Sequence, residues 1–182
     1  RNPLSGMSLA VERLEEELPE AGDRYIKILE TNIDRISIIL KEFLFSFRNQ
    51  TLSLNKCSLK EIINHTLETA GENIRLRNVK VSTDVSGSER MLALDKNKME
   101  IALFNIITNA MEAMEPNKGH LQIKSNWTKN SCCLTIQDNG SGIPQENLTQ
   151  IFDPFFSLKK NRKGLGLSLV ERILTAHEAS FE

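Results

Sequence analysis

Four short segments follow one another in a fixed order over about sixty residues, and they constrain the fold more than any other feature. Any one of them also occurs by accident, as an amide-bearing helix face, an Asp-Asn-Gly turn or a Gly-x-Gly helix start. Their order and spacing together predict a nucleotide site. The segments are Asn105-Ile-Ile-Thr-Asn109, Asp138-Asn-Gly140-Ser-Gly142, Phe152-Asp-Pro-Phe-Phe156 and Gly164-Leu-Gly166-Leu167.

The first fifty residues predict a helical hairpin. Apolar residues of its second arm recur at alternating steps of three and four, which is a heptad seam. The first arm, residues 3–18, has its own apolar face, and residues 18–23 supply the turn. Two helices alone bury too little surface, so we expect a homodimer through residues 1–50 that forms a four-helix bundle. A hairpin that packs on its own following domain is the alternative. The seam residues are Ile26, Leu29, Ile33, Ile36, Leu40, Phe43 and Phe47.

Residues 51–182 predict a second domain, a two-layer α/β sandwich in which three helices cover one antiparallel or mixed sheet. The whole chain is therefore of the α+β class. A capping box at 58–61 opens a helix to about Glu72, and Asp95 caps a long helix through Met114. Residues 180–182 resemble the start of a further, truncated strand. Expected strands are 79–85, 91–94, 121–127 and 132–137, and the buried side of the long helix is expected to hold Met99, Leu103, Ile106, Ala110 and Met114.

Composition limits the function classes. The chain of 182 residues is 40% hydrophobic and 26% charged, which is typical of a globular protein, and no apolar run approaches the roughly 20 residues that span a bilayer. We therefore expect no membrane contact from this segment. A net charge of -1 gives no general attraction for nucleic acid. Cys57, Cys132 and Cys133 lack metal-ligand spacing and are interpreted as reduced packing residues, which favours a cytoplasmic location.

Asn105 and Asn109 lie four residues apart, so their amides share one face of the long helix. A buried amide without a partner costs about 1 to 3 kcal/mol. Mg²⁺ brought in by a nucleotide would suit these amides, because it takes oxygen ligands and is held by few protein groups plus phosphate. The alternative is that the two amides are exposed or cap a neighbouring loop.

The other segments add a base site and a phosphate site. Asp138 is expected at the end of a strand, where a semi-buried carboxylate could accept a hydrogen bond from an exocyclic amine such as that of adenine. The alternative is that Asp138, Asn139 and Gly140 form a plain turn. Gly164 begins the last helix, whose free N–H groups favour phosphate. The loop before it is basic and either closes over a triphosphate or is a solvated surface loop; its cations are Lys159, Lys160, Arg162 and Lys163.

Taken together, the four segments resemble the N box, first glycine box, F box and second glycine box of the catalytic ATP-binding domain of sensor histidine kinases, a Bergerat-fold family. Arg1-Asn-Pro-Leu4 is similar to the tail of that family's H box, and residues 1–50 resemble its dimerisation and phosphoacceptor hairpin. The resemblance covers almost the whole chain. Residues 157–163 are similar to the short ATP lids of nitrogen-regulatory-type kinases.

The resemblance implies ATP and Mg²⁺ as cofactors and assigns site residues. Asn109 would hold Mg²⁺ with help from Asn105, and Asp138 would recognise adenine. The base pocket would be shaped by Gly140, Gly142 and Ile143, and the phosphates would be bordered by Gly164, Leu165, Gly166 and Leu167. The lid would be anchored by Phe152, Phe155 and Phe156, and its cations would be Lys159 and Lys160.

The implied reaction is phosphoryl transfer from ATP to a histidine three residues before Arg1, followed by transfer to an aspartate of a response-regulator receiver domain. Asn2 falls four residues after that histidine and is a candidate for positioning water in the reverse phosphatase reaction, or a helix cap. His65, His120 and His177 are interpreted as structural. After the last helix, the resemblance implies two glycines where this chain has Glu178 and Ala179.

Two alternatives remain open from the sequence. An ATPase of the topoisomerase or chaperone type needs a carboxylate to activate water, and Asn105 stands at that position instead. A dimeric pseudokinase scaffold would bind nucleotide without transferring phosphate. The phosphoacceptor histidine would lie before Arg1, so these residues are compatible with this hypothesis as well.

Overall fold

The computed structural model describes residue 29 and residues 51–85, 90–129, 131–159 and 164–181. The chain divides into two units, Arg1–Gln50 and Thr51–Glu182. The predicted hairpin, its dimer and Asn2 lie outside the described residues, so these expectations stay predictions. No helix in the described part of the chain is long and apolar enough to cross a membrane.

A three-stranded mixed sheet forms one layer of this unit, as predicted. It consists of β2 (Lys80–Val85), β4 (His120–Trp127) and β5 (Cys132–Asp138), in the order β2-β4-β5. Strand β4 is parallel to β2 and antiparallel to β5. Its buried residues alternate with exposed ones, so one face of the sheet packs on the helices and the other meets solvent.

The two remaining strands form a sheet of their own, which corrects the prediction of a single sheet. Strands β1 (Asn55–Ser58) and β3 (Met91–Leu94) pair antiparallel and join no strand of the mixed sheet among the described residues. Alternating polarity identifies such four-residue strands, but it does not encode which neighbour they pair with. The partner is decided by the loops that bring the strands together.

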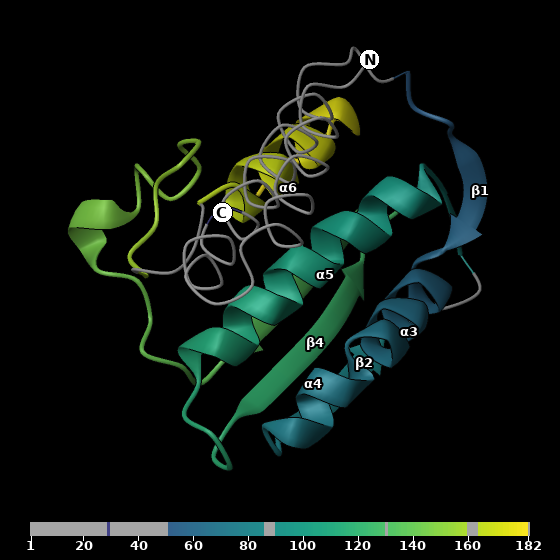
Figure 1. The fold of residues 1–182 in the computed structure, drawn as a ribbon. Helices are drawn as coiled ribbons and strands as arrows, with labels where there is room; N and C mark the ends of the chain where they lie inside the picture. Colours follow the sequence, from purple (N-terminus) through teal and green to yellow (C-terminus); the bar gives the residue numbers. More distant parts are fainter. Residues whose placement is uncertain (1–28, 30–50, 86–89, 130, 160–163, 182) are drawn as a thin grey trace, which may run out of the picture. The chain divides into compact units, whose positions relative to one another are not determined.

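Four helices of the described residues and one 3-10 turn, η1 (Gln145–Asn147), complete the unit. Helix α5 (Lys96–Ala113) lies between α3 (Leu59–Thr69) and α6 (Gly166–Ala176), with β4 behind it (Figure 1). Helix α3 begins where the capping box predicts.

Helix α3 lacks the predicted side-chain cap and ends earlier than predicted. The side chain of Ser58 makes no capping hydrogen bond, and the helix ends at Thr69 instead of continuing to Glu72. Buried Ala70 separates it from the short helix α4 (Gly71–Leu76). The chain therefore turns at Ala70, a position that periodicity alone does not mark.

Helix α5 is the central element of the core. Asp95 caps it as predicted, because its Oδ1 accepts from the backbone N–H of Lys98 at 3.2 Å. Ile106 is partly buried instead of fully buried, and Ile107 is 1% exposed. A helix covered by a sheet and by two helices buries a wider arc than a single stripe. Its buried residues are Met99, Ala102, Leu103, Ile107, Ala110 and Met111, and Met114, just beyond its last turn, is buried as predicted.

The end of the described chain differs from the expected strand. No strand follows α6 as far as Phe181, whose ring instead packs on Phe152 with the centroids 4.8 Å apart.

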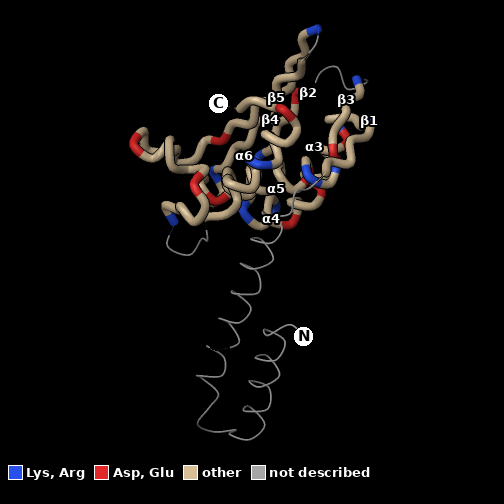
Figure 2. Tube along the Cα trace, turned by 90° about the horizontal axis from the view of Figure 1, so that it is seen from above, with Lys and Arg blue, Asp and Glu red and all other residues tan. Residues whose placement is uncertain are grey.

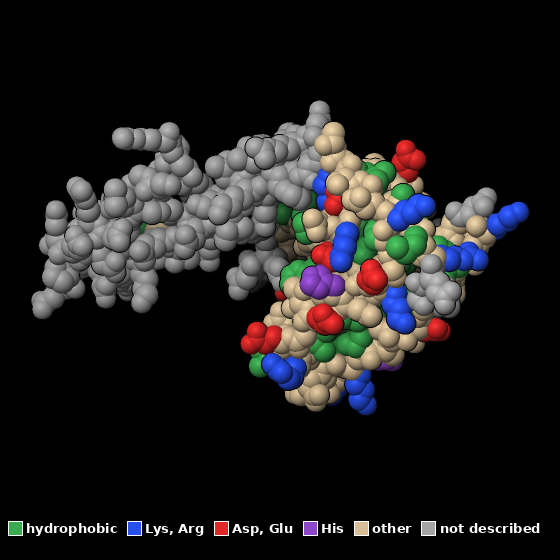
Figure 3. Space-filling view, turned by 90° about the vertical axis from the view of Figure 1, so that its right-hand side faces the viewer, with side chains coloured by type: hydrophobic (Ala, Val, Ile, Leu, Met, Phe, Trp, Pro, Cys, Tyr) green, Lys and Arg blue, Asp and Glu red, His purple; other side chains and the backbone are tan. Residues whose placement is uncertain are grey.

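Acidic and basic residues are interspersed along the described trace (Figure 2). The face shown in Figure 3 likewise mixes both signs over its surface.

Candidate nucleotide site

The amide face of α5 meets the start of α6. A Cβ atom placed on Gly166 would lie 2.9 Å from Oδ1 of Asn105 and 3.9 Å from Nδ2 of Asn109. The absence of a side chain at Gly166 therefore lets the first turn of α6 approach both amides. Leu165 and Leu167 flank this contact and are partly buried. The structure thus brings together the first and the last of the four sequence segments.

The orientation of the Asn105 amide suits a cation. Its Nδ2 donates to the carbonyl oxygen of Ile101 at 2.8 Å, which leaves Oδ1 on the side of Gly166. An oxygen ligand on this face is what Mg²⁺ requires. The described residues contain no group of three His, Cys, Asp or Glu side chains able to hold a metal. Oδ1 of Asn105 therefore fits a Mg²⁺ ion that receives its other ligands from phosphate and water, whereas the atom of Asn109 nearest to Gly166 is the donor Nδ2.

At the other end of α5, the strand-end turn packs directly on the helix. Oδ1 of Asp138 accepts from the backbone N–H of Gly140 at 2.8 Å. A Cβ on Gly140 would come within 2.7 Å of the Ala113 backbone, so glycine is required here by packing on the helix. The N–H of Ser141 donates to the carbonyl oxygen of Ala113 at 3.1 Å. The turn is thus anchored to the last residue of α5.

Asp138 is exposed instead of semi-buried, which corrects the expectation for the base site. It closes its own turn through Oδ1, and Oδ2 is able to accept a further hydrogen bond. Gly142 adopts a φ of 69°, in the left-handed region that favours glycine. Ile143 follows it and is 45% exposed, which offers an apolar surface beside the carboxylate.

The F box and the second glycine box lie against each other. The backbone N–H of Phe155 donates to the carbonyl oxygen of Gly164 at 2.9 Å. Gly164 has a φ of 66°, and a Cβ there would collide with the backbone of Phe155 and Phe156. The two ends of the predicted lid are therefore held together. Phe156 is partly buried, whereas Phe155 is 59% exposed; Lys160, Arg162 and Lys163 lie outside the described residues.

Lys159 and Glu112 form an ion pair that was not predicted from the sequence. Nζ of Lys159 lies 3.2 Å from Oε2 of Glu112. Burial lowers the pKa of the Lys159 ammonium, nearby Arg77 lowers it further, and Asp138 raises it. Glu112 follows Asn109 by three residues, so the sequence places it on the amide face of α5 but does not indicate its partner. Arg77, whose Nη1 donates to the carbonyl oxygen of Met111 at 3.0 Å, gave no such signal.

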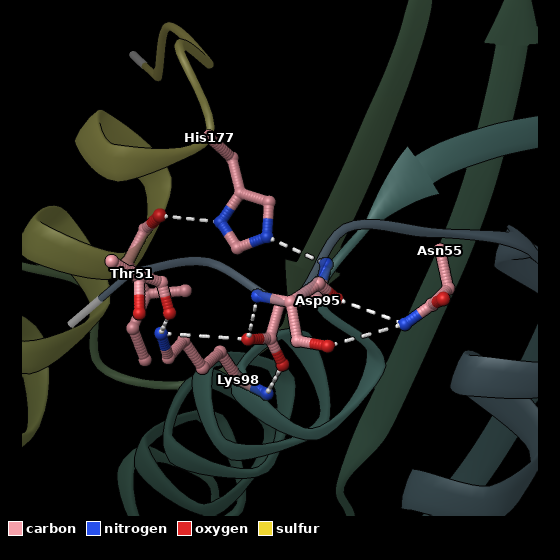
Figure 4. A network of polar contacts seen from close by, with 7 residues as sticks. Thr51, Asn55, Asp95, Lys98 and His177 are labelled. Atoms are coloured by element: carbon pink, nitrogen blue, oxygen red, sulfur yellow. Dashed lines mark hydrogen bonds and ion pairs between the residues drawn. The ribbon is translucent and has the colours of Figure 1, made fainter.

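A polar network fixes α5 against α6 and the first residues of the unit (Figure 4). Oδ2 of Asp95 accepts from the backbone N–H of Ser53 at 3.1 Å, and Nζ of Lys98 donates to the carbonyl oxygen of Thr51 at 3.2 Å. The backbone N–H of Asp95 donates to Nε2 of His177 at 3.0 Å. His177 thus joins the ends of two helices, in keeping with the structural role predicted for it.

A two-layer α/β unit in which an amide-bearing helix meets a glycine-started helix has the arrangement of a Bergerat-type ATPase domain. Residues 94–182 match the family described as histidine kinase-, DNA gyrase B- and HSP90-like ATPase. Sporulation kinase C of Bacillus subtilis is 31% identical over 183 aligned residues, which cover 100% of this chain and 42% of the relative. The chain thus spans about two fifths of that relative's length.

Solved structures agree with this assignment. The catalytic domain of histidine kinase ThkA is 28% identical, with a TM-score of 0.63 over 68% of this chain and 80% of that one. ThkA in complex with response regulator protein TrrA is 27% identical, with a TM-score of 0.63 over 86% of this chain and 47% of that one. This chain therefore carries the ATPase domain of a sensor histidine kinase.

Proposed function

We propose that the chain is the kinase core of a two-component sensor histidine kinase. It would use MgATP to phosphorylate a histidine that precedes Arg1 by three residues, and then transfer the phosphoryl group to an aspartate of a response-regulator receiver domain. The similarity to sporulation kinase C along the whole chain and to ThkA, a kinase that was solved with a response regulator, supports this proposal.

The observation that carries the nucleotide site is the approach of Gly166 to Asn105 and Asn109. The oxygen of Asn105 and the first turn of α6 lie on one side of α5, and Asp138 lies at the far end of the same helix. A nucleotide along α5 would place its adenine at Asp138 and its phosphates at Gly166. Bound Mg²⁺ would neutralise phosphate charge, and the protein would mainly position the reactants.

The site is tested by measuring MgATP affinity calorimetrically. Asp138→Asn keeps an oxygen for the N–H of Gly140 but replaces the second oxygen with a donor, so it is unable to accept from the adenine amine. We expect a loss of about tenfold or more, since a hydrogen bond to a charged group contributes about 1.5 to 3 kcal/mol. Asn109→Ala should lower the affinity for MgATP more than that for adenosine. Asn126→Ala, on the exposed face of β4, is the matched control.

The transfer steps need a protein that includes the residues before Arg1. Labelling with γ-phosphate-labelled ATP should modify the upstream histidine, and a receiver domain should then remove the label. Nucleotide binding without labelling would instead favour the scaffold function. We also propose that Asn2 positions water for the phosphatase reaction, so Asn2→Ala should spare autophosphorylation while slowing dephosphorylation. Equal loss of both activities would refute that role.

The homodimer through residues 1–50 is part of this proposal. It would provide the four-helix bundle on which the phosphoacceptor histidine is presented. Sedimentation of a fragment covering residues 1–50 measures its mass directly, and a folded monomer would exclude the dimer.

A further inference from the structure

Glu112 stands on the helix face that the proposed function assigns to Mg²⁺ and phosphate. It follows Asn109 by three residues and Asn105 by seven, so all three side chains lie along one side of α5. The side chain of Glu112 is 22% exposed. A carboxylate at this place opposes a polyanionic ligand, because like charges in a partly buried site repel each other with little screening.

The same carboxylate holds Lys159, the first cation of the basic loop predicted to attract phosphate. Nζ of Lys159, from the segment that follows the F box, lies 3.2 Å from Oε2 of Glu112 across 47 residues of sequence. Lys159 also lies near the charges of Asp138 and Arg77, and its side chain is 43% exposed. An ammonium group with three donors divides them, and its single charge, between Glu112 and a nearby phosphate, so the contact with Glu112 weakens its attraction for the phosphate.

We propose that Glu112 determines how strongly the site discriminates adenine ligands by their charge, because it competes with the polyphosphate for Lys159. The inference rests on the proposed nucleotide site and adds to it a residue that opposes binding. Glu112 lowers the affinity for MgATP and MgADP, and it leaves the binding of adenosine, which has no phosphate, nearly unchanged. It acts through Lys159 and is a specificity-determining residue, not a catalytic one.

A different role for Glu112 predicts the opposite sign. A carboxylate beside Asn109 would be a good ligand for Mg²⁺. Removing such a ligand would weaken the binding of MgATP, whereas removing a competitor for Lys159 would strengthen it. The contact with Lys159 favours competition, and the sign of the change in affinity separates the two roles.

The test is a double-mutant cycle on the chain of residues 1–182, with dissociation constants measured calorimetrically for MgATP, MgADP and adenosine. Glu112→Gln should lower the dissociation constant of MgATP by about three- to tenfold, in line with coupling energies of charge pairs in contact. The dissociation constant of MgADP should fall by less, and that of adenosine should change by less than about twofold. In a Lys159→Met background, the gain from Glu112→Gln should fall to about twofold or less, because the ammonium for which it competes is gone.

Glu115→Gln is the matched control. Glu115 lies three residues further along the chain and pairs with Lys118 at 2.8 Å, with both side chains about three quarters exposed. It should leave all three affinities unchanged. Weaker MgATP binding by Glu112→Gln would overturn the inference in favour of a Mg²⁺ ligand, and equal tightening of adenosine would overturn it in favour of a general opening of the site. An unaltered chain that binds neither nucleotide would overturn the proposed function itself.

Discussion

Nε2 of His177, at the end of α6, accepts a hydrogen bond of 3.0 Å from the backbone N–H of Asp95, at the start of α5. The other ring nitrogen, Nδ1, lies 2.7 Å from the carbonyl oxygen of Ile173. The two partners require the ring proton on Nδ1, since Nε2 must accept. One imidazole therefore ties together the same two helices that also meet at Asn105 and Gly166, the candidate phosphate end of the site.

Removal of this imidazole should destabilise the protein. His177→Ala leaves the partly buried N–H of Asp95 without its acceptor, and we expect a loss of about 1 to 3 kcal/mol in the free energy of unfolding. Urea denaturation followed by circular dichroism measures this. His65→Ala is the control, because that imidazole is 58% exposed and should change stability by less than about 0.5 kcal/mol. Equal losses in both variants would contradict the role given to His177.

The carboxyl group of Asp95 should make stability depend on pH. Burial raises its pKa, but the N–H groups of Ser53 and Lys98 and the Lys98 ammonium together outweigh this and lower the pKa in the folded state. The stabilisation is therefore fully present above the unfolded pKa of about 3.9 and is lost as the pH falls through the lower folded value. Asp95→Asn should cost about 1 to 2 kcal/mol at pH 7.

The difference between Asp95→Asn and the unaltered chain should shrink in acid, below about pH 4, as the carboxylate of the unaltered protein becomes protonated. Chemical denaturation at several pH values between neutral and acid gives this curve. Asp84→Asn, on the exposed face of β2, should cause little change at pH 7. A difference that stays constant down to pH 3 would show that the charge of Asp95 is not what stabilises the fold.

Local chemistry explains which parts of the fold the sequence predicts well. Asp95 before an apolar-periodic run marks the start of α5, and alternation together with the polar turn at 128–131 defines the β4–β5 hairpin. These signals act within a few residues, so they survive in the folded protein. The separation of β1 and β3 from the mixed sheet depends on contacts between distant segments, which periodicity does not carry.

In the candidate site, too, local features were predicted from the sequence and contacts between distant residues were not. The spacing of Asn105 and Asn109 was sufficient to place both amides on one face. The last helix was predicted to begin at Gly164, whereas α6 begins at Gly166, and Gly164 precedes it with a φ of 66°. The ion pair of Glu112 with Lys159 spans 47 residues, and Arg77 comes from the loop before β2. No local pattern marks such contacts. The exposure of Asp138 was also missed, since it depends on how the turn packs on Ala113.

Glu178 sits in a conformation that suits glycine better. Its φ is 56°, and it follows the C-cap of α6. The N–H groups of Glu178 and Ala179 donate to the carbonyl oxygens of Thr175 and Leu174, which is a Schellman motif. A residue with a Cβ is strained in the left-handed region by about 1 to 2 kcal/mol. Glu178→Gly should therefore raise the unfolding free energy by about 0.5 to 1 kcal/mol, after the greater freedom of glycine in the unfolded chain is subtracted.

Glu178→Ala is the control for that gain, because it removes the same charge and keeps a Cβ. It should stabilise the protein less than glycine does. Thermal unfolding of the three proteins in parallel gives the comparison, and an equal rise for alanine would assign the effect to the charge at the helix end instead of the backbone.

The three cysteines should differ in reactivity. All are free thiols; Cys133 is exposed, Cys132 is partly buried and Cys57 is buried. Burial raises the pKa of the Cys132 thiol, and the neighbouring Cys133 raises it further, so Cys132 forms less of the reactive thiolate. Iodoacetamide at pH 8 should modify Cys133 first and Cys57 last, as followed by peptide mass spectrometry. In urea the three rates should converge, and early labelling of Cys132 in the native protein would contradict the order.

The contact between Gly166 and Asn105 makes the sharpest prediction about the site. Alanine at position 166 favours the helix by up to about 1 kcal/mol relative to glycine, so the fold should persist. Its Cβ, 2.9 Å from Oδ1 of Asn105, would displace the oxygen offered to Mg²⁺. Gly166→Ala should therefore weaken MgATP binding by about tenfold, and Asn105→Ala added to it should cost little more, because both changes remove the same ligand. Gly71→Ala, a helical position with open space, should leave the affinity unchanged; full affinity in Gly166→Ala would remove Asn105 from the site.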